Sequence, residues 1–425
     1  MHPYLIEGID FGSGSFVEEG LRINNAGTVV SSVFGSLNES NGSSLGFTWR
    51  PTIGVKYLTL PFPYNILGPS VAAGINDEGD VVGNWNQHAC MWRDDVMQLL
   101  PDDGAVWSYA FDINPNAVIA GLVRRTIDSS HISLEAVRWR KVRLKWRIDY
   151  ARLPDDELRY LWPAAIDELG RVVGRGQDLN VGAINQRALE WPAPSHSHVK
   201  RLAVPPAGFP SSEALCATNG VSAGLAKESS YDGPPRPYFW SSVGGGFLGS
   251  LPGQTQGKAC GMNSVGQIVG QSGGSACVWN GPVVTNLNSL IDPALGWKLR
   301  LATDINDRGQ IVGLGYRIGQ ANKSEVIFVM SPAIVHIPPV VWQILFGTLT
   351  DKPGVFMGPK GAVPPAATLK TLLRSIPAAH RPLLEELLLA QSKQGLLDKK
   401  RESARPPGEV PLVAGRGKRK KKPLV

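Results

Sequence analysis

The stretch Ile305-Asn306-Asp307-Arg308-Gly309-Gln310-Ile311-Val312-Gly313 decides the fold, because its pattern recurs along the chain. The pattern is an apolar residue, Asn or Asp, a turn, and then an apolar pair followed by a small residue. The other six copies lie at 23–31, 75–83, 113–121, 166–174, 218–224 and 262–270. Their Asn/Asp positions are spaced by 52, 38, 53, 52, 44 and 43 residues. A period of this size with strand patterning indicates β-propeller blades.

The turns of the repeat are typical of β-hairpins. Asn306 to Gly309 suits a type I turn followed by Gly in the left-handed region. Pro115 takes the second turn position of the third copy, where its fixed φ is favourable. The fifth copy is two residues shorter and carries Asn219-Gly220, a strong signal for a two-residue hairpin. Different sequences therefore predict the same reversal between two strands.

Each copy continues into a second strand-like segment that ends in Trp in six copies. These residues are Trp49, Trp92, Trp139, Trp191, Trp240 and Trp279. A fourth strand usually follows, but after Val329 of the seventh copy the chain runs into Ser331-Pro332. The unpaired segment 4–9 can supply the missing strand and so remove an exposed sheet edge. We expect an all-β, seven-bladed β-propeller over residues 1–332, closed by the N-terminal strand.

Composition agrees with this fold class. The 425 residues are 43% hydrophobic, which excludes a disordered chain, and the 48 Gly and 33 Pro favour many tight turns. No run of eighteen apolar residues exists, so a transmembrane segment is not expected. Four cysteines are too few for a disulfide-dense scaffold. Cys90, Cys216, Cys260 and Cys277 are interpreted as small buried residues.

The repeat also resembles the bacterial HAF repeat, named for a His-Ala-Phe triplet ahead of the Trp. His88-Ala89-Cys90 is the copy nearest to that triplet, and 286–292 with Gly296-Trp297 resembles the end of such arrays. The resemblance covers about residues 1–332 and implies an exported protein. The start of the chain lacks a secretory profile, which predicts a cytoplasmic location, or an extracellular or cell-surface one if an upstream signal peptide is missing.

The net charge of +7 is carried by the end of the chain. Residues 366–425 hold 14 Lys+Arg and 5 Asp+Glu, which leaves the rest at −2. We expect a Pro-rich packed linker at 333–365, amphipathic helices at 366–400 and a disordered basic tail at 401–425. The tail ends in the basic run Lys418, Arg419, Lys420, Lys421 and Lys422.

The sequence predicts partner-binding residues rather than a catalytic set. The candidates are Arg138, Arg140, Arg143, Lys145, Arg147 and the tail run Lys418–Lys422. Arg143, Lys145 and Arg147 alternate with apolar residues, which predicts an outer strand with a basic solvent face. His196 and His198 lack a third metal ligand nearby, and acidic turns such as Asp77 to Asp80 are explained by turn propensity. No catalytic, cofactor-binding or metal site is predicted, and no cofactor.

Three functions follow from these features. The leading one is a non-enzymatic scaffold that binds a protein partner through the propeller end loops and the C-terminal helices. The second is a nucleic-acid or ribosome-associated binder acting through the basic tail and the stretch 138–147. The third is a propeller enzyme acting on polysaccharide, with a site in the axial channel that several blades would build. The sequence leans against an enzyme and leaves the oligomeric state open.

Overall fold

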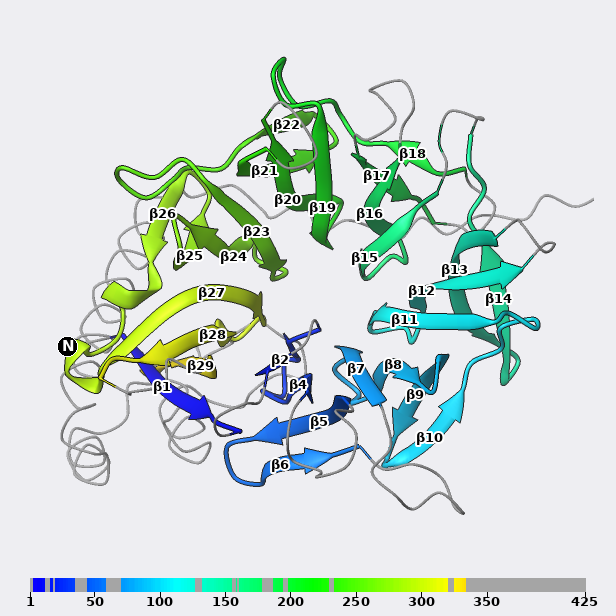
Figure 1. Cartoon of the computed structure of the whole chain (residues 1–425), viewed down its shortest axis with the longest axis horizontal. Coiled ribbons are helices and arrows are strands. Elements are labelled where there is room, and N and C mark those ends of the chain that lie inside the picture. Colours follow the sequence, from blue (N-terminus) through cyan, green and yellow to red (C-terminus); the bar gives the residue numbers. More distant parts are fainter. Residues whose placement is uncertain are drawn as a thin grey trace, which may run out of the picture. The chain divides into compact units, whose positions relative to one another are not determined.

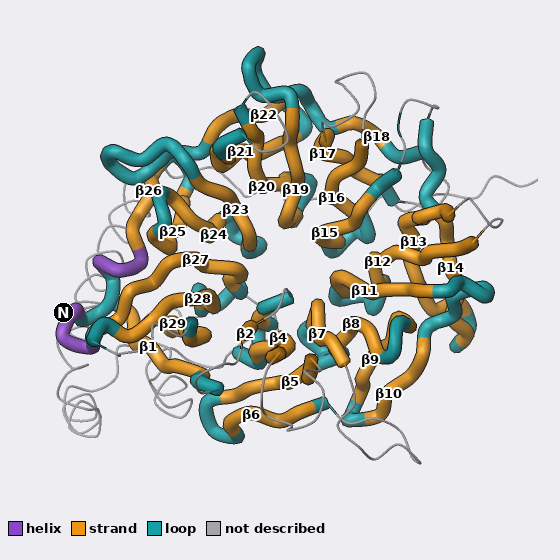
Figure 2. Tube along the Cα trace, viewed as in Figure 1, coloured by secondary structure: helices purple, strands orange, loops and turns teal. Residues whose placement is uncertain are grey.

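The computed structural model describes residues 3–11, 16–17, 20–34, 44–58, 70–126, 132–154, 158, 160–177, 186–193, 198–228, 233–319 and 325–333. The predicted linker, helices and basic tail beyond 333 lie outside the described residues. Within the described part, strands dominate and the helical elements are the short 3₁₀ turns η2 (Leu287–Ser289) and η3 (Pro293–Leu295) (Figure 2). No described helix is long and apolar enough to span a membrane.

The strands form seven antiparallel sheets in a ring, which is the seven-bladed β-propeller that the repeats predict (Figure 1). The first three blades contain β2 (Phe16–Val17), β3 (Arg22–Ile23), β4 (Val29–Phe34), β5 (Ser44–Arg50) and β6 (Gly54–Tyr57); β7 (Ser70–Ile75), β8 (Val81–Trp85), β9 (His88–Arg93) and β10 (Val96–Leu99); and β11 (Trp107–Ile113), β12 (Ile119–Thr126), β13 (Ile132–Val142) and β14 (Lys145–Tyr150).

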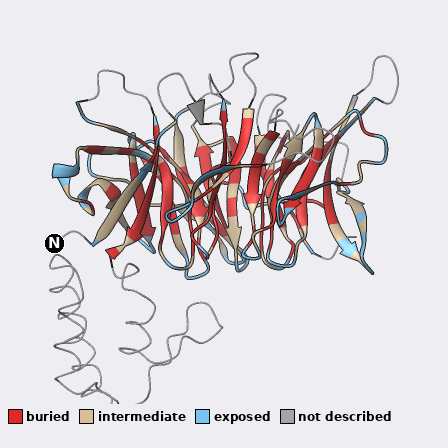
Figure 3. Ribbon diagram, turned by 90° about the horizontal axis from the view of Figure 1, so that it is seen from below, coloured by how far each residue is buried: buried red, intermediate tan, exposed pale blue. Residues whose placement is uncertain are grey.

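The next three blades follow the same order from the axis outwards. They contain β15 (Trp162–Ile166), β16 (Val172–Gln177), β17 (Gln186–Trp191) and β18 (Lys200–Arg201); β19 (Ser211–Thr218), β20 (Val221–Lys227), β21 (Pro235–Ser241) and β22 (Gly244–Phe247); and β23 (Gly257–Met262), β24 (Gln267–Ser272), β25 (Ser275–Asn280) and β26 (Val283–Asn286). Buried residues are concentrated in the strands and exposed ones at the turns (Figure 3).

The seventh blade joins the two ends of the described chain. It consists of β27 (Trp297–Ile305), β28 (Ile311–Arg317), β29 (Val326–Pro332) and, outermost, β1 (Tyr4–Ile9). The pairing of β1 with β29 is antiparallel and runs from Tyr4 opposite Pro332 to Ile9 opposite Ile327. The N-terminal strand therefore closes the ring, as predicted.

The repeat turns have the predicted geometry. Gly309 has a φ of +72° and its N–H donates to the carbonyl of Asn306 at 3.0 Å, as in a type I turn followed by a left-handed residue. Asn219 and Gly220 have φ values of +48° and +79°, as in a type I′ hairpin. In the third copy Ala117 takes the left-handed position with a φ of +54°, which costs more for Ala than for Gly.

The repeat Asn side chains link neighbouring blades at the end where these turns lie, which we call the turn end. The amide of Asn306 donates to the carbonyl of Asn24 at 2.8 Å, that of Asn24 to Asn76 at 2.9 Å, and that of Asn263 to Asn306 at 3.2 Å. Asn114 donates likewise to Asp167 at 2.9 Å. Each of these four Asn Oδ1 atoms also accepts backbone N–H groups of its own turn, so one side chain both caps a turn and bonds the next blade.

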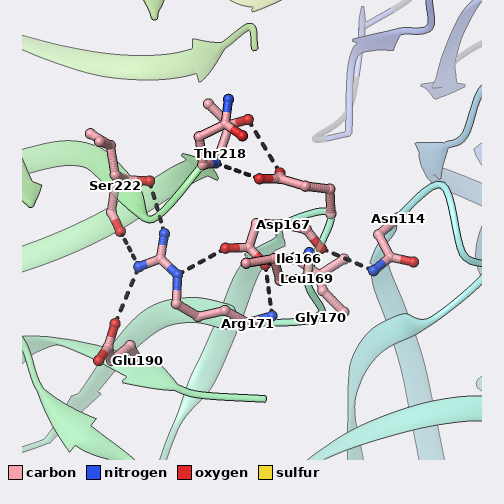
Figure 4. Close-up of polar contacts among 12 residues, drawn as sticks. Asn114, Ile166, Asp167, Leu169, Gly170, Arg171, Glu190, Thr218 and Ser222 are labelled. Atoms are coloured by element: carbon pink, nitrogen blue, oxygen red, sulfur yellow. Dashed lines mark hydrogen bonds and ion pairs between the residues drawn. The ribbon is translucent and has the colours of Figure 1, made fainter. Parts of the chain in front are cut away.

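In the fourth blade a charged pair replaces the Asn side chain as the link to the next blade (Figure 4). Asp167 cannot donate, and its carboxylate instead accepts from Arg171 Nε at 2.9 Å. The Arg171 guanidinium then reaches the fifth blade, where it donates to the carbonyl of Val221 and the hydroxyl of Ser222, both at 2.9 Å. Glu190 binds the same guanidinium at 3.2 Å. Arg171 thus replaces the missing amide as the link between blades.

The Trp residues of the repeat are buried between blades. Trp139, Trp191 and Trp279 are completely buried. The indole N–H of Trp139 donates to the carbonyl of Pro101 at 2.6 Å, and that of Trp240 to Ala203 at 2.9 Å. Both acceptors belong to segments that follow the fourth strand of the preceding blade. Each of these two Trp residues therefore fills the core and ties its blade to the one before it.

Deleting residues 1–9 should open the ring, because β29 would lose its outer partner and expose unpaired backbone groups. We expect the melting temperature to fall by at least about 10 °C and the protein to aggregate on heating. Differential scanning calorimetry with light scattering measures both, and deletion of residues 1–2 serves as the control. A deletion variant that stays monomeric with an unchanged melting temperature would contradict strand closure.

Replacing Arg171 by Ala should lower the free energy of unfolding by about 3 kcal/mol, because it leaves the fully buried Asp167 carboxylate without its charge partner. The double variant Asp167→Asn/Arg171→Gln installs the Asn and Gln found at these two positions in the sixth and seventh copies. It should recover most of the loss. Urea denaturation compares the free energies of unfolding of the variants. A double variant less stable than Arg171→Ala would show that the Asn–Gln pair cannot replace the Asp–Arg pair in this blade.

Candidate functional site

Two of the predicted basic residues are structural contacts. Arg138 is buried, and its guanidinium carbon lies 3.7 Å from the centre of the Trp191 ring while it donates to the carbonyl of Gly170 at 2.7 Å. Burial lowers the pKa of Arg138 to about 10, so the side chain stays charged at neutral pH. Arg140 pairs with Asp149 across the β13–β14 ladder at 2.6 Å. Arg138 therefore links blades three and four and is buried, while its predicted role in partner binding stays a prediction.

The predicted basic residues Arg143, Lys145 and Arg147 lie on an exposed hairpin. Together with Leu144 at its tip, we call them the basic hairpin. Arg143 and Leu144 make the two-residue turn between β13 and β14, with φ values of +49° and +67°. Lys145 and Arg147 are exposed on β14 and alternate with Trp146 and Ile148, as the sequence predicts. Leu144 at the tip is 94% exposed. Arg143 thus belongs to the turn and not to the strand.

The basic run Lys418–Lys422 and His196 lie outside the described residues. Among the residues that the structure describes, no three His, Cys, Asp or Glu side chains gather as a metal site would require. Three cysteines are buried as predicted, and Cys260 is partly exposed. Burial raises the pKa of all four thiols, so none is an activated nucleophile.

Exposed apolar side chains recur at the turn end, and a smaller number, such as Val204 and Ile318, lie at the opposite end. In each described hairpin between a third and a fourth strand, one apolar residue in the turn or at the start of the fourth strand is more than half exposed. These residues are Ile53 at 63%, Val96 at 68%, Leu144 at 94%, Val243 at 95% and Val283 at 59%. Leu169 and Val265 add two more, on turns between first and second strands, at 73% and 67%. We call these seven residues the turn-end apolar set.

A second candidate location is the propeller axis, where the innermost strands of the blades converge (Figure 1). Arg22, Asp112 and Asp304 occupy the same repeat position, two residues before the motif Asn, in blades one, three and seven. Arg22 interacts electrostatically with both carboxylates. We call these three residues the axial cluster. They are separated by at least 90 positions in the sequence, so only the ring brings them together.

Both carboxylates of the axial cluster are held by backbone N–H groups of two blades. Asp304 accepts from Ile305 at 2.9 Å and from Ile23 of the first blade at 3.0 Å. Asp112 accepts from Ile113 and from Ile166 of the fourth blade, both at 2.9 Å. These bonds fix the two carboxylates rigidly beside the axis.

Glycines in the preceding blades make room for the two Asp residues. A Cβ on Gly74 would lie 2.9 Å from the Cα of Asp112, and one on Gly261 would lie 2.6 Å from the Cα of Asp304. Both distances are shorter than a Cβ tolerates, and both contacts are to backbone atoms. Gly74 and Gly261 are therefore needed because the first strands of neighbouring blades approach closely at this position.

Burial dominates the protonation of the axial cluster. It raises the pKa of Asp304 to about 6, although Arg22 and the two backbone bonds act in the opposite direction. The pKa of Asp112 is raised for the same reason, and Arg22 again opposes the shift. For Arg22 burial favours the neutral form, but the attraction of Asp304 and Asp112 outweighs it and the pKa is raised. The cluster therefore holds one carboxyl group that can take up a proton just below neutral pH.

The sequence interpretation missed the axial cluster. The signal was present in the aligned copies, because the column two residues before the motif Asn holds an Arg and two Asp among small residues such as Gly74, Ala165 and Gly261. When one aligned position of a propeller repeat holds small residues in most copies, a charged residue there indicates a group near the axis.

No protein-family model matches the chain, and no curated protein matches it. Solved structures similar to it include a puromycin-hydrolysing peptidase from Mycobacterium tuberculosis, at 11% identity and a TM-score of 0.46, covering 71% of this chain and 49% of the peptidase. The β-propeller domain of the Trilobed protease from Pyrococcus furiosus is 9% identical, with a TM-score of 0.48 and coverage of 76% and 94%. A polysaccharide lyase is 9% identical, with a TM-score of 0.40 and coverage of 75% and 89%.

This chain spans about half of the peptidase. At such identities the likeness concerns the fold alone. The resemblance to the HAF repeat stays a prediction.

Asp304 should make stability depend on pH. Because its pKa in the folded state is about 6 and the pKa in the unfolded chain is about 3.9, the folded protein binds the extra proton between these values. Stability from this group is present below pH 4 and is lost as the pH rises to about 6, with a slope of at most about 1.4 kcal/mol per pH unit. Urea denaturation from pH 4 to 7 should show this slope reduced in Asp304→Asn. An equal reduction in Glu325→Gln, an exposed carboxylate, would contradict the assignment.

Proposed function

We propose that this chain is a non-enzymatic binding scaffold that docks a protein partner on the turn end of its propeller. The observation that carries the proposal is the turn-end apolar set. A large apolar side chain that is more than half exposed contributes little to the stability of the free protein, and exposed apolar groups that recur on one surface are typical of interaction sites. Tight hairpin turns hold these side chains at fixed positions, so little conformational entropy is lost when a partner covers them.

The basic hairpin supplies polar specificity beside the apolar contacts. Leu144 is the most prominent apolar tip of the third blade, and Arg143 and Lys145 flank it directly. An apolar anchor surrounded by charged groups resembles the centre and rim of a protein–protein interface. We infer a partner with an apolar pocket that carries acidic residues at its edge. The predicted C-terminal helices belong to the same proposal as a second contact.

Leu144→Ser combined with Val243→Ser should weaken partner binding at least about tenfold, because it removes two anchors from the turn end. The control is Val204→Ser with Ile318→Ser, at 67% and 65% exposure in segments of the opposite end. Pull-down from lysate followed by quantitative mass spectrometry measures proteins lost in one pair and retained in the other. Melting temperatures should not change. Equal loss in both pairs, or in neither, contradicts docking at the turn end.

The same assay also tests the alternative function, in which the basic tail binds nucleic acid. If binding survives the turn-end substitutions but disappears on deletion of residues 401–425 and falls linearly with the logarithm of salt concentration, the chain acts as a polyanion binder. The basic hairpin then becomes an accessory contact.

The axial cluster favours a second candidate, a propeller enzyme acting on polysaccharide. Asp304, with a pKa of about 6, can exchange a proton near neutral pH, and it interacts electrostatically with Arg22 and Asp112. Both carboxylates are held by two backbone N–H groups, which also suits a purely structural role. Turnover of a polysaccharide that is abolished in Asp304→Asn while partner capture persists would support the enzyme over the scaffold.

A further inference from the structure

A run of aromatic side chains lies on the innermost strands of blades three and four. Trp107, Tyr109 and Phe111 alternate along β11 and so share one face of the strand. The ring centres of Trp107 and Tyr109 are 5.8 Å apart, and those of Tyr109 and Phe111 are 4.7 Å apart. Phe111 in turn lies 5.9 Å from Trp162 of β15. We call these four residues the aromatic run.

The aromatic run remains partly exposed, in contrast to the Trp residues of the repeat. All four residues are partly exposed, whereas the alternate residues Ser108 and Ala110 of the same strand are fully buried. The register shift between Ala110 and Asp112 recurs at the same repeat position in other blades, so it belongs to the repeat. Trp107, Phe111 and Trp162 pack on one side against the core between blades three and four. Because all four residues still keep accessible area, part of the run is open to a ligand.

Charged and polar groups border the aromatic run. The guanidinium carbon of Arg175 lies 5.9 Å from the centre of the Trp162 ring, and Arg175 donates to Glu213 at 2.8 Å. Lys227 binds the other oxygen of Glu213 at 3.2 Å. Asp112 of the axial cluster follows Phe111 directly in the chain. Arg175 thus lies beside the Trp162 ring and is bound to the buried Glu213, which also binds Lys227.

This balance of charge discriminates between the ligands that stack on aromatic rings. A single-stranded nucleic acid needs a positively charged groove for its phosphates, and carboxylates at the site would repel it. A sugar ring has an apolar C–H face and a rim of hydroxyl groups that both donate and accept hydrogen bonds. The aromatic rings can stack on the apolar C–H face, and the guanidinium and carboxylate groups can form hydrogen bonds with the hydroxyl groups.

We propose that the aromatic run, with Arg175 and Glu213, binds an uncharged oligosaccharide beside the propeller axis. The site lies towards the end opposite the turn end, because Trp107 begins the innermost strand of its blade and the motif Asn follows the end of that strand. The proposal is independent of protein docking at the turn end. It would also give the second candidate function a substrate-binding subsite, but binding itself requires no turnover.

The test uses the full-length protein and isothermal titration calorimetry with malto-, cello-, xylo- and mannohexaose, and with a dodecathymidylate as the competing class. We expect at least one hexaose to bind, with its affinity reduced about tenfold or more by Trp107→Ala and by Trp162→Ala. Trp107→Phe, which keeps a ring, should stay within threefold of the wild type. Tyr57→Ala, a partly exposed aromatic residue on the outermost strand of blade one, is the control and should bind normally.

Several outcomes would overturn the proposal. These are failure of all four hexaoses to bind, tighter binding of the dodecathymidylate, or hexaose binding that Trp107→Ala and Trp162→Ala leave unchanged. If the Ala variants do not fold, Arg175→Gln replaces them, and it should weaken hexaose binding with an unchanged melting temperature. Loss of turn-end partner capture in the assay above would leave these results unaffected, so the two proposals fail separately.

Discussion

The double use of one amide side chain is the interaction on which the ring depends. Asn306 accepts two backbone N–H groups of its own turn through Oδ1 and donates to the neighbouring blade through Nδ2. Local turn geometry and the contact between blades are therefore set by the same residue, so a blade cannot shift without breaking its own turn. Where Asp167 replaces the Asn, Arg171 restores the missing donor to the next blade. Asn76 differs, because its amide donates to Asp80 within its own turn.

The same ring that gives rigidity also creates the places where function can arise. Hairpin turns between third and fourth strands, at the same end as the Asn side chains, project apolar groups such as Leu144 and Val243. At the axis, the convergence of seven innermost strands gathers Arg22, Asp112 and Asp304 although no local motif joins them. The turn-end apolar set and the axial cluster thus have different origins. The first arises from hairpins that each blade makes alone, and the second arises from strands that meet only in the closed ring.

Much of the fold could be predicted from the sequence, since the Asn turns, the Trp strands and the unpaired segment at Tyr4 each have a local signal. The exposed alternation of Lys145 and Arg147 was predictable for the same reason. The burial of Arg138 was not, because its partners Trp191 and Gly170 come from the next blade. The axial cluster and the aromatic run likewise depend on which side chains of different blades meet. Local periodicity carries no information about that, although aligned repeat columns carry some.

The pairing of β1 with β29 has a consequence for how the protein is made. β1 is translated before the other described strands, yet in the native fold it is paired with the last strand of the seventh blade, from Tyr4 opposite Pro332 to Ile9 opposite Ile327. At usual rates of translation this partner emerges tens of seconds later. During that interval both the N-terminal strand and the growing edge of the unfinished ring are open to other chains. Successful biosynthesis therefore depends on what shields the N-terminal segment until the final blade has been translated.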